Sequence, residues 1–298
     1  MSSYLESNAR ARLRGLFDAA SFEEFIAPSE RVVSPHLAQL DLPAAFDDGV
    51  AVGRARLDGA SVFVAAQEGG FMGGAVGEVH GAKLTGMLRR AAAERVHAVV
   101  LLLETGGVRL HEANAGLIGV SEVMRAVLDA RAAGVPVVAL VGGSNGAFGG
   151  MGIVARCANA VVMSEEGRLA MSGPAVIETA AGVEEYDARD RALVWRTCGG
   201  KHRYLLGDCQ AIVADTLAAF RLAAIGAVAA AHAQGVGLTL DGLEQEQQML
   251  AARTEAFGAL RDPADIWSAL GMDNPDAIPM LEIDAFTAAA QAHRLAAP

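Results

Sequence analysis

The strongest constraint on the fold is an alternation of apolar runs, glycine turns and helical segments between residues 97 and 164. The runs at 97–103, 137–141 and 160–164 are almost entirely apolar, which is typical of strands buried on both faces of a parallel sheet. Apolar residues recur at helical spacing over 115–133, between the first two runs. Strands that alternate with helices in this way predict an α/β fold with a parallel sheet.

Glycine clusters follow two of these predicted strands directly. Gly106 and Gly107 follow the run 97–103, and the glycine-rich segment 142–150 follows the run 137–141. In parallel sheets, ligands bind beyond the carboxyl ends of the strands. We therefore expect both glycine turns to lie at a binding site.

The flanking sequence predicts a hairpin and two helical extensions. Asp58-Gly59 stands between the apolar runs 50–57 and 60–67, and this arrangement predicts a β-hairpin. Apolar residues near the N-terminus recur at helical spacing, and the chain beyond about residue 202 is rich in alanine. We expect a single domain over 1–298 with three parts: a helical N-terminal arm at 1–45, a core at 46–200 and a helical C-terminal part at 201–298.

Charge and composition exclude several classes of protein. The net charge is −11 and no block of Lys or Arg is present, which argues against nucleic-acid binding. The first twenty residues lack the apolar core of a signal peptide. The longest apolar stretch, 217–231, is interrupted by Arg221 and is too short for a membrane span. The three cysteines form no CxxC pair, so we expect reduced thiols in a cytoplasmic protein without a nucleic-acid or membrane partner.

A serine hydrolase is one interpretation of the second turn. Residues 142–146 match G-x-S-x-G between a predicted strand and a predicted helix, which is the context of a nucleophile elbow. Acids and histidines that could complete a triad follow downstream: Asp187, Asp208, Asp215, His202, His232 and His293. In the alternative interpretation, Ser144 only makes a local hydrogen bond. Spacing alone does not decide between the two.

The sequence matches nucleotide-binding and metal-binding motifs only incompletely. Gly150-x-Gly152-x-x-Ala155 fits a dinucleotide-binding fingerprint, but this motif does not follow its strand at 137–141 directly. His111-Glu112 does not continue into HExxH, because residue 115 is alanine. We therefore expect no metal site.

A third interpretation treats the two glycine turns as a pair. A thioester enolate carries negative charge on one oxygen, and two rigid backbone N–H donors near a helix N-terminus would stabilise that charge. Gly106-Gly107 and Gly149-Gly150 could supply such donors, because glycine lets the backbone approach a ligand closely. Glycine turns are common in α/β proteins, so spacing leaves this interpretation open as well.

Motifs spread over residues 9–215 resemble those of acyl-CoA carboxyltransferases. The segment 104–112, ETGGVRLHE, resembles the family motif SGGAR-x-x-E, and 71–84, FMGGAVGEVHGAKL, resembles FGGS-x-GE-x-x-G-x-K-I. The segment 171–178, MSGPAVIE, is similar to F-x-GP-x-VIE. The resemblance implies a crotonase-like fold, a ββα superhelix with N- and C-terminal helical extensions, whose glycine turns form oxyanion holes for acyl thioesters.

Within that family, the chain looks most like the β subunits of biotin-independent malonate decarboxylases. It has no N-terminal four-cysteine zinc ribbon, and Thr105 and Val108 replace the usual serine and alanine. The resemblance implies a carbon–carbon lyase that converts malonyl-S-acyl-carrier protein to acetyl-S-acyl-carrier protein and CO2. It also implies a homologous γ subunit and an acyl-carrier subunit as partners. The phosphopantetheine-type group of the carrier would hold the substrate, and this chain would bind no cofactor. Two alternatives stay open, namely carboxyl transfer between biotin and malonyl- or acetyl-CoA, and a non-catalytic scaffold.

The resemblance also implies particular site residues. The backbones of four glycines are expected to supply oxyanion donors: Gly106, Gly107, Gly149 and Gly150. Five residues are expected to bind substrate: Gly73, Gly74, Ala75, Val108 and Arg109. Arg109 could steer the malonyl carboxylate, or it could hold the turn through a structural ion pair.

Overall fold

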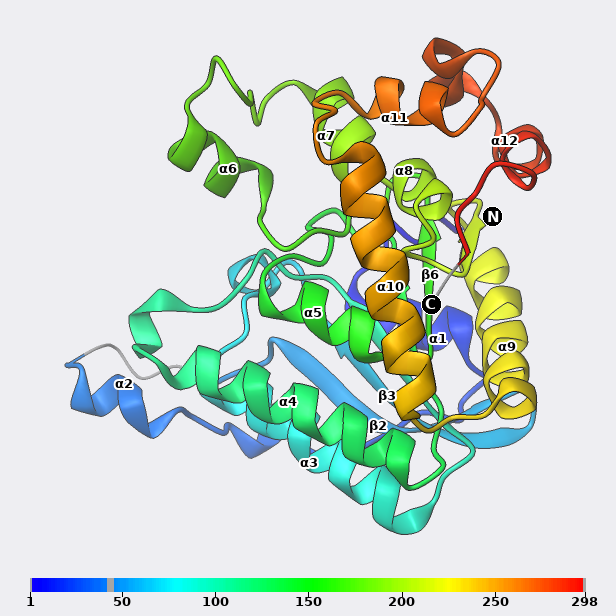
Figure 1. The fold of residues 1–298 in the computed structure, drawn as a ribbon. Helices are drawn as coiled ribbons and strands as arrows, with labels where there is room; N and C mark the ends of the chain where they lie inside the picture. The colour runs from blue at the N-terminus through cyan, green and yellow to red at the C-terminus, as the bar shows by residue number, and fades with distance from the viewer. Residues whose placement is uncertain (1, 42–45, 297–298) are drawn as a thin grey trace.

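The computed structural model describes residues 2–41 and 46–296, and a seven-stranded sheet forms its centre (Figure 1). The strands lie in the order in which they occur in the chain, and every pair from β3 to β7 is parallel. β1 and β2 pair antiparallel, and β2 and β3 form the predicted hairpin. The strands are β1 (Glu23–Glu24), β2 (Val50–Leu57), β3 (Ala60–Gln67), β4 (Ala98–Leu103), β5 (Val137–Val141), β6 (Ala160–Ser164) and β7 (Ala211–Val213).

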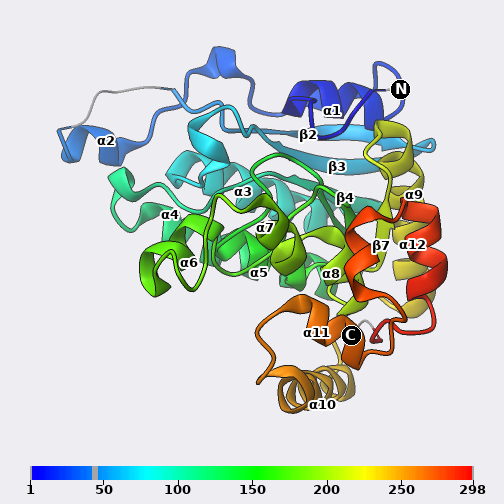
Figure 2. The ribbon, with the colours of Figure 1, turned by 90° about the horizontal axis from the view of Figure 1, so that it is seen from above.

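Helices cover both faces of this sheet. One face packs against α3 (Glu78–Glu94), α4 (Ala115–Ala132) and α5 (Gly150–Cys157), and the other against α1 (Ala9–Leu16) and α9 (Leu217–Gln234) (Figure 2). All six residues of β4 are buried because alternate side chains enter the two apolar layers. The predicted α/β fold with a parallel sheet is therefore confirmed.

A second row of short pairings lies beyond the carboxyl ends of the strands. Val76 pairs with Val108, Thr105 with Ala147, and Ala147 with Leu169, each as a parallel bridge. This row was not predicted from the sequence, because single-residue bridges have no apolar periodicity. It fixes the segments that follow β4, β5 and β6 beside one another.

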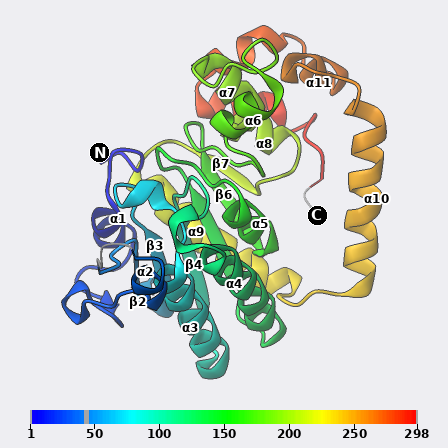
Figure 3. The same ribbon diagram turned by 90° about the vertical axis from the view of Figure 1, so that its left-hand side faces the viewer.

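The C-terminal part is largely helical, the N-terminal arm contains three short helices, and each part adds one short strand to the sheet. The N-terminal arm holds α1, η1 (Pro28–Glu30), α2 (Pro35–Gln39) and strand β1, while its residues 42–45 lie outside the described residues. The C-terminal part holds β7 and a series of helices: α8 (Gly200–Leu205), α9, α10 (Leu240–Phe257), α11 (Pro263–Ala269), η4 (Pro275–Met280) and α12 (Ile283–Ala290). Figure 3 shows α10 well apart from the sheet. The division at residues 45 and 200 stays a prediction.

Helix α9 is longer than the sequence suggested. Its 18 residues are long and apolar enough to cross a membrane by length and composition, so the expectation that this stretch is too short was wrong. One face of α9, with Phe220, Ala224 and Val228, is buried against the sheet and α1. Only 22% of the helix is buried, so α9 covers the sheet with one face and leaves the rest of its surface uncovered by the described residues of this chain.

Candidate active site

The two glycine turns lie side by side, as the sequence predicted. The first turn follows β4 and the second leads into α5. Thr105 N–H donates to the Gly146 carbonyl at 2.8 Å, and Phe148 N–H donates to the Thr105 carbonyl at 3.1 Å. A Cβ atom built on Gly149 would lie 3.5 Å from Cα of Gly107. The backbones of the two turns are therefore in close contact at the carboxyl edge of the sheet.

Three of the four expected backbone donors are already occupied within the chain. Gly106 N–H donates to the Gly73 carbonyl at 3.0 Å, and Gly149 N–H donates to the Met171 carbonyl at 2.9 Å. Gly107 N–H donates to Oγ1 of Thr105 at 3.1 Å. The expectation that these three amides face a substrate is therefore wrong for this conformation, because each one holds its own turn together.

Within the segments 105–109 and 147–150, two amides remain without an acceptor among residues 2–41 and 46–296. One is the N–H of Gly150, the first residue of α5, where the partial positive charge of the helix lies. The other is the N–H of Val108. Its neighbours in the chain, Gly107 C=O and Arg109 N–H, both bond to Val76, so the Val108 amide points to the opposite side. Each of these two segments thus keeps one free donor.

Glycine at position 150 is explained by packing. A Cβ atom there would collide with the side chain of Val120 in α4, so glycine lets α5 begin close against α4. Gly152 is explained in the same way, since a Cβ atom would lie 2.7 Å from the Ala170 carbonyl oxygen. Close packing of α5 against α4 and against the loop with Ala170 therefore accounts for both glycines of the dinucleotide fingerprint.

The loop with Gly73, Gly74 and Ala75 packs against the first turn. It contains the short helix η2 (Met72–Gly74), in which Gly73 and Gly74 have positive φ angles of 65° and 71°. A side chain on Gly74 would collide with the backbone carbonyl of Glu104. These residues therefore form one wall of the turn cluster, which agrees with their expected position. Their contact with substrate stays a prediction.

Arg109 is a structural residue in this conformation. Its guanidinium is buried and pairs with both carboxylate oxygens of Asp47, at 2.5 and 3.1 Å, and with Glu112 at 3.1 Å. Burial raises the pKa of Asp47, but the hydrogen bond and charge of Arg109 outweigh this effect and lower it. Nε of Arg109 also donates to the Ala75 carbonyl at 2.9 Å. The expected role of Arg109 in binding a substrate carboxylate is therefore corrected: its charge is already neutralised inside the protein.

Sequence reasoning missed Glu104, the residue that connects the parts of the site. It directly follows β4, is almost fully buried and forms an ion pair with Arg12 of α1. Its carboxylate also accepts from Oγ of Ser144 at 3.1 Å and from the amide of Asn145 at 3.4 Å. The side chain of Asn145 donates to the Gly69 carbonyl at 3.0 Å. The sequence did contain one signal for Glu104, because a charged residue stands directly after a six-residue apolar strand.

Ser144 does not have the surroundings of a nucleophile. Its hydroxyl donates to Glu104, and no histidine is bonded to it among the described residues. The three histidines considered as triad members bond elsewhere, His202 to Trp267, His232 to the His97 carbonyl and His293 to the Leu270 carbonyl. The geometry therefore supports the local hydrogen bond rather than the hydrolase interpretation.

Repeated strand–turn–helix units, a second row of bridges and paired glycine turns define a carboxyltransferase of crotonase-like fold. The chain belongs to the carboxyl transferase domain family, whose profile matches residues 6–213. The resemblance seen in the sequence motifs is confirmed.

Several relatives cover nearly the whole chain. It is 38% identical to the malonyl-S-ACP:biotin-protein carboxyltransferase of Malonomonas rubra, over 99% of this chain and 97% of the relative. It is also similar to a chain of a Pseudomonas malonate decarboxylase hetero-tetramer crystallised with malonate, with a TM-score of 0.79 and 39% identity over 90% of this chain and 97% of that chain. A Pseudomonas malonate decarboxylase hetero-dimer gives a TM-score of 0.65 and 37% identity over 84% and 96% of the two chains.

Proposed function

We propose that this chain is a malonate decarboxylase subunit that converts a malonyl thioester on an acyl-carrier subunit to the acetyl thioester and CO2. The observation that carries this proposal is the pair of adjoining glycine turns, in which the N–H groups of Val108 and Gly150 have no acceptor among the described residues. The near full-length similarity to malonate decarboxylase and malonyl-S-ACP carboxyltransferase chains supports the choice of substrate.

In the proposed reaction, the bond between the carboxylate carbon and the methylene carbon breaks. CO2 leaves, and the electron pair left on the methylene carbon delocalises onto the thioester oxygen. The N–H groups of Val108 and Gly150 would donate to that oxygen, and the N-terminus of α5 would add its partial positive charge. A proton from water or from the partner subunit then converts the enolate to the acetyl group. No protein nucleophile is required.

A second subunit would complete the substrate site beside the turns. Five large apolar side chains in the segments that follow the turns are exposed, and we call them the apolar rim: Leu110, Leu117, Ile118, Met171 and Val176. Leu110 begins the short helix η3 (Leu110–Glu112) that follows the first turn, and its exposed fraction is 85%. Met171 provides the carbonyl that holds Gly149. Exposed apolar patches of this kind mark protein interfaces.

Helix α6 (Pro174–Ala181) supports the same inference. It contains no buried residue and projects from the body of the molecule (Figure 1). The Pseudomonas structures similar to this chain are hetero-oligomers, and we propose that the apolar rim and α6 contact a homologous γ subunit. The carrier subunit, its phosphopantetheine-type group and a cytoplasmic location remain part of this proposal.

Carboxyl transfer to biotin is the second candidate. The Malonomonas rubra relative is named as a transferase to a biotin protein, and enolate stabilisation by the same amides would serve either reaction. The two candidates differ in whether the carboxyl group leaves as CO2 or stays on biotin.

The test uses the chain purified with its co-expressed partner and a malonyl-loaded carrier. Intact-mass spectrometry should detect loss of one CO2 from the carrier without any biotinylated acceptor. Mass loss that occurs only with a biotinylated protein, together with carboxybiotin on it, would instead establish the transferase. Parallel reactions with malonyl-CoA separate the two possible thioester carriers.

A further inference from the structure

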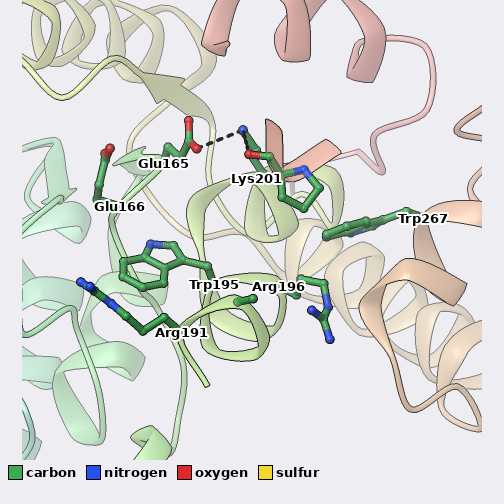
Figure 4. A pocket seen from close by; sticks show the side chains of 9 residues that line it. Glu165, Glu166, Arg191, Trp195, Arg196, Lys201 and Trp267 are labelled. Atoms are coloured by element: carbon green, nitrogen blue, oxygen red, sulfur yellow. Dashed lines mark hydrogen bonds and ion pairs between the residues drawn. The ribbon is translucent and has the colours of Figure 1, made fainter. Parts of the chain in front are cut away.

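A cavity lies beyond the carboxyl end of β6, and none of the glycine-turn residues 106–108 and 149–150 lines it. It has a volume of about 350 Å³ and mostly apolar walls, a size and character typical of small-molecule sites. Glu165 and Glu166 follow β6, Arg191 and Trp195 lie on α7 (Arg191–Cys198), and Trp267 lies on α11 (Figure 4). Val194 and Cys198 of α7 belong to a buried apolar cluster with Phe148 and Tyr186.

Two of the cations that line this cavity are already neutralised. Nζ of Lys201 lies 3.1 Å from Glu165 and also donates to the carbonyls of Pro279 and Leu281, at 3.0 and 2.6 Å. Arg196 pairs with Asp262 at 3.1 Å. These groups stabilise the walls, and they leave no net charge for a ligand.

Three polar groups of the lining residues have no partner among the described residues. Arg191 makes no ion pair, and its guanidinium carbon lies 5.1 Å from the centre of the Trp195 ring. Nε of Arg196 and Oε2 of Glu166 are buried without a hydrogen bond. Burial raises the pKa of Glu166, and the charges of Asp215 and Glu165 add to this effect. The Arg191 guanidinium and Nε of Arg196 both offer hydrogen atoms to a ligand.

We propose that this cavity binds a small organic monocarboxylate with an apolar body. The carboxylate would pair with Arg191, which is exposed and makes no ion pair among the described residues, and the body would lie against Trp195 and Pro279. A dicarboxylate is disfavoured, because its second carboxylate would lie against mostly apolar walls without an unpaired cation to bind. This site is independent of the proposed reaction at the glycine turns.

The two tryptophans of the chain both line the cavity, so intrinsic fluorescence reports on its occupancy. The full-length chain is titrated with benzoate as the probe, and benzamide serves as the uncharged isostere. We expect saturable quenching by benzoate at millimolar or lower concentration, with benzamide at least tenfold weaker because it cannot pair with the guanidinium. In the Trp267→Phe variant, the fluorescence comes from Trp195 alone. If that variant does not fold, the same titration is carried out with the wild-type protein.

A matched pair of variants tests the role of Arg191. Arg191→Gln should weaken benzoate binding at least tenfold, whereas Arg189→Gln, an exposed arginine that does not line the cavity, should change it less than twofold. Equal quenching by benzamide and benzoate, equal weakening in the two variants, or no saturable change up to about 10 mM benzoate would each overturn the proposal.

Discussion

Arg12 of α1 and Glu104 at the end of β4 form a buried ion pair that joins residues 92 positions apart in the sequence. Nε of Arg12 also donates to the Tyr4 carbonyl at 2.9 Å, and its guanidinium lies over the Tyr4 ring. The pair connects the N-terminal arm to both glycine turns, because Glu104 also holds Ser144 and Asn145. Gly69 and Gly143 leave the space that the carboxylate occupies.

Loss of the Glu104 charge should destabilise the protein strongly. Glu104→Gln leaves the Arg12 guanidinium buried without a counter-charge, and we expect the free energy of unfolding to fall by about 3–5 kcal/mol. Urea unfolding measures this change. The double variant Glu104→Gln/Arg12→Met should lose less than the sum of the single variants. Arg89→Met, which removes an exposed pair with Glu122, is the control and should barely change stability. Similar losses in Glu104→Gln and Arg89→Met would contradict the buried-pair argument.

Gly150→Ala should abolish most of the proposed decarboxylation. The new methyl group collides with Val120 and displaces the Gly150 amide, so we expect a loss of about 100-fold in acetyl-carrier formation, comparable to removal of one oxyanion donor. Adding Val120→Ala makes room for the methyl group and should restore part of the rate. Gly86→Ala in α3 meets no neighbouring atom and should leave the rate unchanged. A Gly150→Ala enzyme as active as Gly86→Ala would refute the assigned donor.

Arg109→Met should affect stability rather than substrate affinity. The substitution leaves Asp47 and Glu112 buried without their shared cation, and we expect about 3–5 kcal/mol less free energy of unfolding. Chemical denaturation and steady-state kinetics with malonyl-carrier are measured together. A stable variant with only a raised KM would restore the substrate-binding role that the geometry argues against.

Ser144→Ala should keep most of the activity. The serine hydroxyl supplies one hydrogen bond to Glu104, so its removal should cost about 1–2 kcal/mol of stability and leave the rate within about threefold. Wild-type protein should also resist labelling by a fluorophosphonate probe, because no histidine is bonded to this serine among the described residues. Labelling at Ser144 would revive the hydrolase interpretation.

Acid should destabilise the protein through two buried histidines. Burial lowers the pKa of His80 to about 3 and that of His202 to about 3, while the unfolded value is about 6.5. Between pH 6.5 and 3 the unfolded chain binds more protons, so stability falls as the pH falls, by up to about 1.4 kcal/mol per pH unit for each histidine. Urea unfolding from pH 7 to pH 4.5 measures this slope. His80→Gln should have a shallower slope than wild type, whereas exposed His111→Gln should match it. Parallel slopes in all three proteins would count against this account.

Much of the architecture was predictable from local patterns. The hairpin β2–β3 and the strands β5 and β6 occur where the apolar runs predicted them, and β4 differs by one residue at its start. Apolar periodicity depends on which face of an element is buried, and that information repeats within a few residues of sequence. The glycines after β4 and before α5 were recognisable as turns because they stand between a predicted strand and a predicted helix. That the two turns lie close together followed from the parallel sheet, in which adjacent strands end at the same edge.

Tertiary structure alone decided which groups of the site are free. Gly106 and Gly149 looked like donors in the sequence, but the carbonyls of Gly73 and Met171 occupy their amides. Arg109 and Glu104 are both charged residues close to a glycine turn. Arg109 is neutralised by Asp47 and Glu104 by Arg12, and both partners are far away in the sequence. The sequence by itself determined the strands β2 to β6, the turns and the family, whereas the short edge strands β1 and β7 were not predicted. Only the tertiary structure decided the free amides, the buried ion pairs and the cavity on α7, since these features depend on contacts between residues far apart in the chain. The residues next to a polar group in the sequence do not show which distant group forms its hydrogen bond.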